Sequence, residues 1–201
     1  MFDNLTVDIQ QAQKHNAGPG ESMWKILMRP TTFAVVNYRF GRWVRTKPKL
    51  FRFGLGVIAT VVRYITEIVT GVHISPFANI GPGLVVHTPY GVFVGPTTIG
   101  SNCVIQHGVV ITYGTRRIGN DVYFSPGAKV VGNVTIGNNV LVMPNSVVVV
   151  DVPDDSTVVG VPARIRLPRG RTLKSQTGRQ YWLRELEQVP ANGSRENWKT
   201  G

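Results

Sequence analysis

The middle of this chain places an aliphatic or aromatic residue at nearly every sixth position. Aligned on that residue, residues 74–153 read ISPFAN, IGPGLV, VHTPYG, FVGPTT, IGSNCV, IQHGVV, ITYGTRR, IGNDVY, FSPGAK, VVGNVT, IGNNVL, VMPNSV and VVVDVP, with one insertion, Val92, after the third segment. All thirteen segments open with Ile, Val or Phe. The pair Ile-Gly recurs at Ile80, Ile99, Ile118 and Ile136, which lie 19, 19 and 18 residues apart. Every third hexapeptide therefore starts again in the same register.

This double period predicts a triangular coil. Each hexapeptide forms a short strand and a corner, and each strand stacks on a strand of the preceding coil. The opening side chains point inward and form one continuous core, while Gly, Asn and Pro gather at corners that need less common backbone angles. We therefore predict a mainly β fold, a parallel β-helix of roughly five coils. The period alone leaves the handedness of the coil open.

The 201 residues divide into four segments by composition. Residues 1–20 are polar and end in Ala-Gly-Pro-Gly, which predicts a flexible leader. Residues 21–73 carry apolar residues at three- and four-residue steps with basic residues between them, which is typical of basic amphipathic helices. Residues 74–166 hold the repeats. Residues 167–201 form a basic tail, in which a short helix is expected near residues 181–189.

The charge of the chain predicts an anionic partner. Lys and Arg number 22 against 11 Asp and Glu, and the formal net charge is +11. Glu67 is the only acid between Ser22 and Asn120. The basic helices either cap the open end of the coil in an oligomer, since an unpaired strand edge invites aggregation, or bind a membrane surface, and the two roles are compatible. No nucleic-acid-binding motif accompanies the charge, so no nucleic acid is expected.

Three features bear on the location of the protein. Residues 1–13 are polar and contain acids, unlike a secretory signal. The most apolar early stretch, residues 51–72, contains three charged residues and makes a poor transmembrane span. The single cysteine, Cys103, excludes a disulfide framework and a thiolate zinc site. We expect a cytoplasmic protein, with the inner face of the membrane as the second expected location.

Several stretches of the repeat region match a known family. They are IGPGL at residues 80–84 followed by HTPYG at 87–91, IGSNC at 99–103, GAKVVGNVTIG at 127–137 and GVPARI at 160–165. In these stretches the chain is similar to the hexapeptide acyltransferases, and it most resembles their serine acetyltransferase branch. The resemblance implies a left-handed coil, a homotrimer or dimer of trimers, and acetyl-CoA as the acyl donor.

His87 is the candidate general base. It takes the second position of its hexapeptide, beside the inward Val86, so its ring is expected to point outward. Acetyl transfer to a hydroxyl needs a base near neutral pH, and the resemblance places the family's catalytic histidine at His87. His107 lies three hexapeptides later on the same face, one strand spacing of about 5 Å away but offset by one position, and a supporting catalytic role is predicted for it. No role is expected for His15 or His73.

The donor site is predicted along the outside of the coil. In the resembling proteins the pantetheine arm of coenzyme A lies along the coil between neighbouring subunits, and arginines suit its phosphates. The predicted acetyl-CoA-binding residues are Thr112, Gly114, Ser125, Gly127, Ala128, Met143, Asn145, Arg164 and Arg166. Cys103 takes an inward fifth position, so it is expected to pack in the core and to carry no acyl group.

The acceptor is predicted from departures from the family. The resemblance implies an aspartate about one coil before the histidine, but residues 70–74 contain no acid. It also implies an acid just before the histidine, where this chain has Val86, and a longer loop with another histidine, where it has only residues 113–117. Acids suit the amino group of serine. We therefore favour the hydroxyl of a sugar in surface-polysaccharide biosynthesis, and serine O-acetyltransfer in cysteine biosynthesis is the alternative.

Two further alternatives come from other functional classes. A γ-carbonic-anhydrase-like zinc enzyme would need three converging histidines, whereas only His87 and His107 are in register, so no metal is expected. A non-catalytic structural trimer is the second. The favoured function is an acetyl-CoA-dependent O-acetyltransferase that transfers the acetyl group directly, with His87 as the base.

Overall fold

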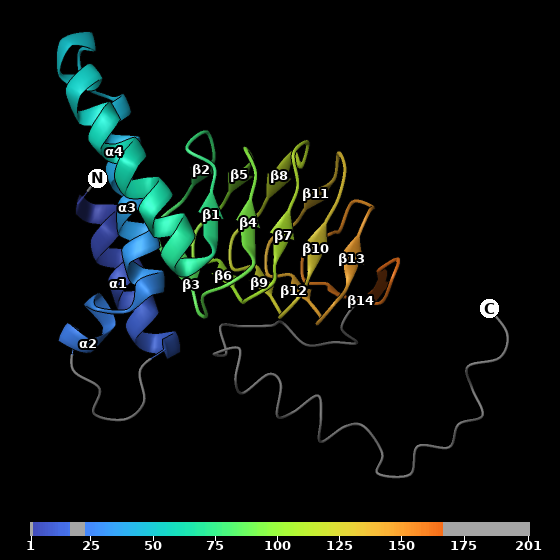
Figure 1. The fold of residues 1–201 in the computed structure, drawn as a ribbon. Coiled ribbons are helices and arrows are strands. Elements are labelled where there is room, and N and C mark those ends of the chain that lie inside the picture. The colour runs from blue at the N-terminus through green and yellow to red at the C-terminus, as the bar shows by residue number, and fades with distance from the viewer. Residues whose placement is uncertain (1, 17–22, 167–201) are drawn as a thin grey trace, which may run out of the picture.

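The computed structural model describes residues 2–16 and 23–166 (Figure 1). Its helices are α1 (Phe2–Asn16), α2 (Met23–Leu27), α3 (Pro30–Arg45) and α4 (Lys49–Thr70). The prediction of a flexible leader is wrong for Phe2–Asn16, because these residues form a helix with a buried side chain, Asp8. The first strand begins at Val72, two residues before the expected start of the repeats at 74. The expected tail helix lies outside the described residues.

The strands form three sheets, one for each side of a triangular coil. The first sheet contains β1 (Val72–Ile74), β4 (Val92–Val94), β7 (Val110–Ile111), β10 (Lys129–Val130) and β13 (Val147–Val148). The second contains β2 (Asn79–Ile80), β5 (Thr98–Ile99), β8 (Arg117–Ile118) and β11 (Thr135–Ile136). The third contains β3 (Val85–Val86), β6 (Val104–Ile105), β9 (Tyr123–Phe124), β12 (Leu141–Val142), β14 (Thr157–Val159) and β15 (Arg164–Arg166).

Each strand pairs in parallel with the strand one coil away, except that β15 runs antiparallel to β14. Ile80, Ile99, Ile118 and Ile136 stack in one column of the second sheet, and each is less than 5% exposed. The predicted fold class, a left-handed parallel β-helix preceded by helices, is confirmed. The hexapeptide period places an apolar side chain from each of the strands β1 to β14 in one stacked core, and removal of these side chains from water is the main stabilising contribution to the coil.

Glycines allow the coils to approach closely at the corner between the third and first sheets. Gly91, Gly108 and Gly127 stack there, with φ angles of 71°, 68° and 73°. This left-handed region favours glycine. A Cβ atom on Gly91 would lie 3.4 Å from Cα of Gly108, and one on Gly108 would lie 3.4 Å from Cα of Gly127. The chain can therefore turn at the same point in successive coils and keep the side chains before the turn in register.

Helices α1 and α3 cover the first coil and are held there by a buried ion pair. Nε of Arg39 donates to Asp8 at 2.8 Å, and the two side chains are 5% and 3% exposed. Arg39 also donates to the carbonyl oxygen of Ile80, and Asp8 accepts from the N–H groups of Gly83 and Leu84 at 2.7 and 2.9 Å. The ion pair thus satisfies backbone groups of the first coil, which has no earlier coil to pair with them. The helices cover the open end of the coil, as the cap interpretation predicts.

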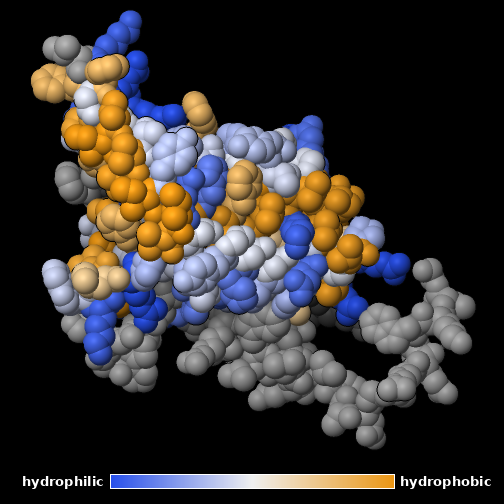
Figure 2. Space-filling view, viewed as in Figure 1, coloured by the Kyte–Doolittle hydropathy of each residue, from blue (hydrophilic) through white to orange (hydrophobic). Residues whose placement is uncertain are grey.

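Helix α4 packs on α3 and leaves most of its surface exposed. Residues Phe51–Thr70 are long and apolar enough to cross a membrane by length and composition, and 17% of the most apolar window is buried. The three charges of residues 51–72 predict that this stretch is a poor transmembrane helix. Two of these charges, Arg63 and Glu67, pair with each other at 2.8 Å on the inner part of the helix. Figure 2 shows the resulting hydrophobic stripe along α4.

Candidate active site

The two candidate histidines lie at the corner where the chain passes from the third sheet to the first. His87 follows β3 and is half-buried, and His107 follows β6 and is exposed. The backbones stack as predicted, since the N–H of His87 donates to the carbonyl of Ile105 at 2.9 Å. The second-position residue above His87 is Gln106, and His107 takes the place above Thr88. The predicted offset of one position is therefore confirmed.

The hydroxyl of Thr88 lies between the two histidines. It lies 3.4 Å from Nδ1 of His87 and 3.4 Å from Nδ1 of His107, and it donates to Oε1 of Gln106 at 3.0 Å. Because its only proton points to Gln106, the oxygen can only accept hydrogen bonds from the rings. This favours the tautomer with the proton on Nδ1, and Nε2 of His87 then carries the lone pair that a general base needs.

Gln106 and Tyr123 hold this threonine in place. Gln106 is 8% exposed, and its Nε2 donates to the hydroxyl of Tyr123 at 2.7 Å. A hydrogen-bonded chain therefore runs from Tyr123 through Gln106 to Thr88, across three successive coils. Sequence reasoning did not assign Thr88, Gln106 or Tyr123 to the site. The available signal was the register, because Gln106 has the same second position in its hexapeptide as His87.

Helix α1 brings a third histidine near His87. Burial lowers the pKa of His15, and the positive charges of His87 and Lys14 lower it further. Ala12 of the same helix packs on Val85 and Val104, the strand residues next to the candidate site. The expectation that His15 lies in a loose leader is therefore wrong. Burial and the neighbouring cations therefore disfavour the charged form of the His15 ring.

The described carboxylates pair at other places in the molecule. Their partners are Arg39 for Asp8, Arg63 and His73 for Glu67, Asn102 for Asp121, Arg116 for Asp151, Asn138 for Asp154 and Asn139 for Asp155. The acid that the family resemblance implied for residues 70–74 is absent from the sequence there. Glu67 lies nearest in sequence, and its Oε1 is 3.0 Å from Nδ1 of His73. The hydroxyl of Thr88 is a side-chain contact of Nδ1 of His87.

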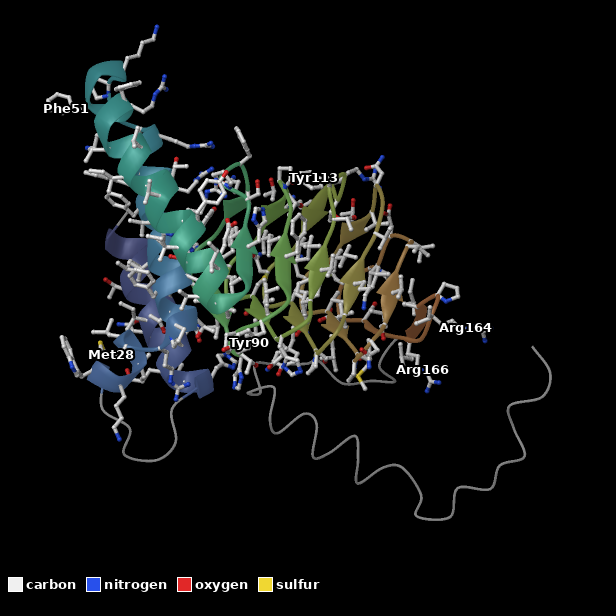
Figure 3. All side chains as sticks on the ribbon, in the orientation of Figure 1. Met28, Phe51, Tyr90, Tyr113, Arg164 and Arg166 are labelled. Carbon is white, nitrogen blue, oxygen red and sulfur yellow. The ribbon has the colours of Figure 1, made fainter. Side chains whose placement is uncertain are left out.

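Seven of the nine predicted donor residues fall into three groups. Gly127, Met143 and Asn145 belong to the corner of His87, since Gly127 N–H donates to the carbonyl of His107 and Asn145 N–H to that of Pro126. Thr112 and Gly114 follow β7, at the next corner of the triangle. In Figure 3 the labelled neighbours of these two corners, Tyr90 and Tyr113, lie at opposite edges of the first sheet, and Arg164 and Arg166 lie at the far end of the coil.

The side chains of two predicted donor residues point into the coil, so only their backbone groups can line the predicted path of the donor. The side chains of Ser125 and Ala128 are both 0% exposed. Ala128 belongs to the apolar core, and the hydroxyl of Ser125 is buried without a hydrogen-bond partner among the described residues. Ala128 occupies a fifth position, which the repeat turns inward. Neither side chain can contact a ligand on the outside of the coil.

The described residues offer neither a reactive thiol nor a cluster of metal ligands. Cys103 is 0% exposed, and burial raises the pKa of its thiol to about 12, so it forms no thiolate near neutral pH. Its prediction as a core residue agrees with this environment. Within residues 2–16 and 23–166, no group of three or more His, Cys, Asp or Glu side chains is arranged to hold a metal ion.

Comparison with known proteins places this geometry in context. Residues 117–149 match the family model described as bacterial transferase hexapeptide, six repeats. A serine acetyltransferase from Synechococcus elongatus is 34% identical over 173 residues, which are 82% of this chain and 68% of that protein.

Solved structures agree with this similarity. The crystal structure of the Neisseria gonorrhoeae serine acetyltransferase in complex with serine matches 82% of this chain and 68% of its own, with 30% identity and a TM-score of 0.68. That of the Brucella abortus serine acetyltransferase in complex with coenzyme A matches 85% and 69%, with 28% identity and a TM-score of 0.71. The chain spans about two thirds of the length of each relative.

Proposed function

This chain belongs to the serine acetyltransferase family of hexapeptide-repeat acyltransferases and uses acetyl-CoA as its co-substrate, and we propose that it transfers the acetyl group to the hydroxyl of L-serine. The observation that carries the proposal is the hydrogen-bonded chain from Tyr123 through Gln106 to Thr88. This series of hydrogen bonds fixes the hydroxyl of Thr88 as an acceptor beside Nδ1 of His87, and so prepares the imidazole to act as a base.

The proposed mechanism is a direct transfer. Nε2 of His87 takes the proton from the acceptor hydroxyl while the oxygen attacks the thioester carbonyl. The tetrahedral intermediate then expels the coenzyme A thiolate, which takes the proton back from the imidazolium as the ester forms. Thr88 accepts a hydrogen bond from Nδ1 in both charge states of the ring. Cys103 takes no part, because its thiol is buried and its pKa is raised.

L-serine is proposed as the acceptor because the relatives carry that name and the Neisseria protein was solved with serine. The sequence analysis favoured a sugar hydroxyl, and one observation still supports a sugar as the second candidate. The side chains assigned to the corner, His15, Thr88, Gln106, His107 and Tyr123, include no carboxylate for an ammonium group. A sugar hydroxyl needs no such partner.

We also propose that the active form is a trimer, with coenzyme A between neighbouring subunits. The predicted donor residues Gly127 and Thr112 lie at two different corners of one triangular coil. An extended ligand along the coil axis can follow only one corner of a single subunit. The second corner must then come from a neighbour, which a threefold arrangement supplies. Light scattering tests this, and a fully active monomer at working concentration would overturn it.

The acceptor is tested by incubating the purified protein with acetyl-CoA and L-serine, N-acetyl-L-serine, simple sugars or nucleotide sugars. Thiol release gives the rate, and mass spectrometry identifies the ester. We expect O-acetyl-L-serine to be the principal product, and kcat/KM for N-acetyl-L-serine to be at least about tenfold lower if the ammonium group is recognised. Turnover with a sugar and none with L-serine would establish the second candidate instead.

A further inference from the structure

Helix α4 carries a long apolar surface that faces away from α3. We define the apolar face of α4 as its large hydrophobic side chains that are at least half exposed: Phe51, Phe53, Val57, Ile58, Val61, Tyr64, Ile65, Ile68 and Val69. They recur at three- and four-residue steps on one side of a 22-residue helix, which is about 33 Å long. A soluble monomer rarely exposes so large a contiguous apolar area, so this face marks an interaction surface.

A cluster of cations lies around the N-terminal end of α4. We define the basic tip as Arg45, Lys47, Lys49 and Arg52, at the turn between α3 and α4. The guanidinium of Arg45 lies 4.2 Å from the ring centre of Phe77, and Nζ of Lys47 lies 4.4 Å from that of Trp43. Lys49 and Arg52 are exposed. The sequence contains no acid from residue 22 to residue 66, so nothing there neutralises this charge locally.

A cavity of about 330 Å³ opens between α3, α4 and the start of the coil, beside the basic tip. Arg45 and Arg52 line it together with small residues of the two helices, such as Gly41 and Gly56. The ion pair of Arg63 and Glu67 lies on its wall. Arginine side chains at an apolar surface are suited to phosphate groups, because the guanidinium donates several hydrogen bonds and is weakly hydrated. The cavity therefore offers a phosphate-binding edge next to an apolar face.

We propose that α4 binds the surface of a membrane that contains anionic phospholipids. The apolar face lies at the boundary between head groups and acyl chains, and the basic tip contacts lipid phosphates. Charge selects this partner over a second copy of the chain at this surface, because a copy packed there would bring its own basic tip near this one. An anionic surface neutralises these charges.

The connections of α4 favour a position on the surface over a path across the bilayer. Gly71, at φ 63°, ends the helix and leads directly into β1 at Val72. At the other end, the turn joins α4 to α3, which the buried pair of Arg39 and Asp8 fixes to the coil. The C-terminal end of α4 is therefore fixed to the coil, and its N-terminal end is fixed to a helix that packs on α4 and on the coil, so α4 cannot leave the rest of the molecule to cross the membrane alone.

The test uses the full chain and sedimentation with vesicles. One set is phosphatidylcholine alone, and the other is equal parts of phosphatidylcholine and phosphatidylglycerol. We expect binding to the second set only, weakened when the salt is raised from about 0.1 M to about 0.5 M because screening shortens the reach of the charges. Equal binding to both sets, or to neither, overturns the proposal. Protein that resists both high salt and alkaline carbonate overturns the surface position.

Paired variants separate the apolar and charged parts. Val61→Asp, on α4 at 51% exposure, is expected to lower vesicle binding at least about tenfold, because a carboxylate replaces a membrane-facing side chain. Val150→Asp, on the coil at 47% exposure, is the matched control and should bind like the wild type. Replacing Lys49 and Arg52 by Gln should weaken binding about 30-fold, and Arg117→Gln on the coil should not.

Folding and assembly are checked with the same variants. Circular dichroism establishes that each variant is folded. If Val61→Asp is not folded, Phe53→Ser, which changes a side chain that is 79% exposed near the basic tip, repeats the test. Light scattering measures the oligomeric mass. A Val61→Asp variant that keeps vesicle binding but loses mass would overturn the proposal and assign the apolar face to contact between copies. Acetyltransfer from acetyl-CoA to serine is assayed separately without lipid, so failure of the proposed function would not affect this result.

Discussion

The coil and the helices before it bury apolar residues in opposite ways. Each of the strands β1 to β14 turns a side chain into a closed core, and Ile118 of β8 is 0% exposed there. Helix α4 instead shows most of its apolar residues, and Ile68 is 84% exposed. The coil is therefore stabilised by its own repeats, whereas α4 is a surface for another molecule. In this protein, hydrophobic residues with a period of six lie in the core of the coil, whereas the hydrophobic residues on one face of α4 form a contact surface for another molecule.

The largest effect is expected for the chemistry of the coil. His87→Ala should lower turnover by about two to four orders of magnitude, because general acid–base catalysis contributes that much. The KM for acetyl-CoA should change little, since the ring acts on the acceptor proton. Initial rates at varied acetyl-CoA measure both. A nearly active His87→Ala together with an inactive His107→Ala would move the base one coil along.

The second largest effect is expected where helices and coil meet. Arg39→Met should destabilise the protein by about 3–5 kcal/mol, because it leaves the carboxylate of Asp8 buried without its ion pair. Urea unfolding followed by circular dichroism gives the free energy. Arg42→Met on the same helix is the control. It removes hydrogen bonds to Asn79 and to the carbonyl oxygen of Ala78 but leaves no buried charge, so it should cost about 1 kcal/mol. Equal losses would mean that the ion pair does not fix the helices.

Truncating an isoleucine should cost much more stability in the core of the coil than on the exposed face of α4. Ile118→Ala should cost about 2–5 kcal/mol, because it leaves a cavity in the coil core. Ile65→Ala on α4, at 55% exposure, should change the unfolding free energy by less than about 0.5 kcal/mol without lipid. Urea unfolding measures both variants. A large loss for Ile65→Ala would show that α4 is part of the core and contradict the comparison.

The smallest effect is expected from pH. The pKa of His15 is lowered from 6.5 in the folded state, so the unfolded chain binds its proton more readily. This contribution to stability is therefore complete above pH 6.5 and is lost as the pH falls through that value. Solvent screening limits it to below about 1 kcal/mol. Thermal unfolding at about pH 8 and about pH 5.5 should show a smaller acid loss for His15→Asn than for the wild type.

How far the sequence predicts this structure depends on the range of the contacts. The coil was predictable, because the inward position of a residue such as Ile99 follows from its place in a six-residue repeat. His87 was found by its register and by a family resemblance. The pair of Asp8 and Arg39 was not predictable, since it joins residues 31 positions apart in helices without a repeat. Thr88 was missed for a similar reason, because its role depends on Gln106, 18 residues away.

The reversed strand at the end of the coil has a consequence for solubility. A stack of parallel strands could continue from molecule to molecule and grow into a fibre. Strand β15 folds back antiparallel on β14, and its residues Arg164 and Arg166 are exposed at the sheet edge. A second molecule that added a strand there would have to bring its backbone against two cations. With α1 and α3 over the first coil, the described part of the chain has a stop against end-to-end polymerisation at both ends.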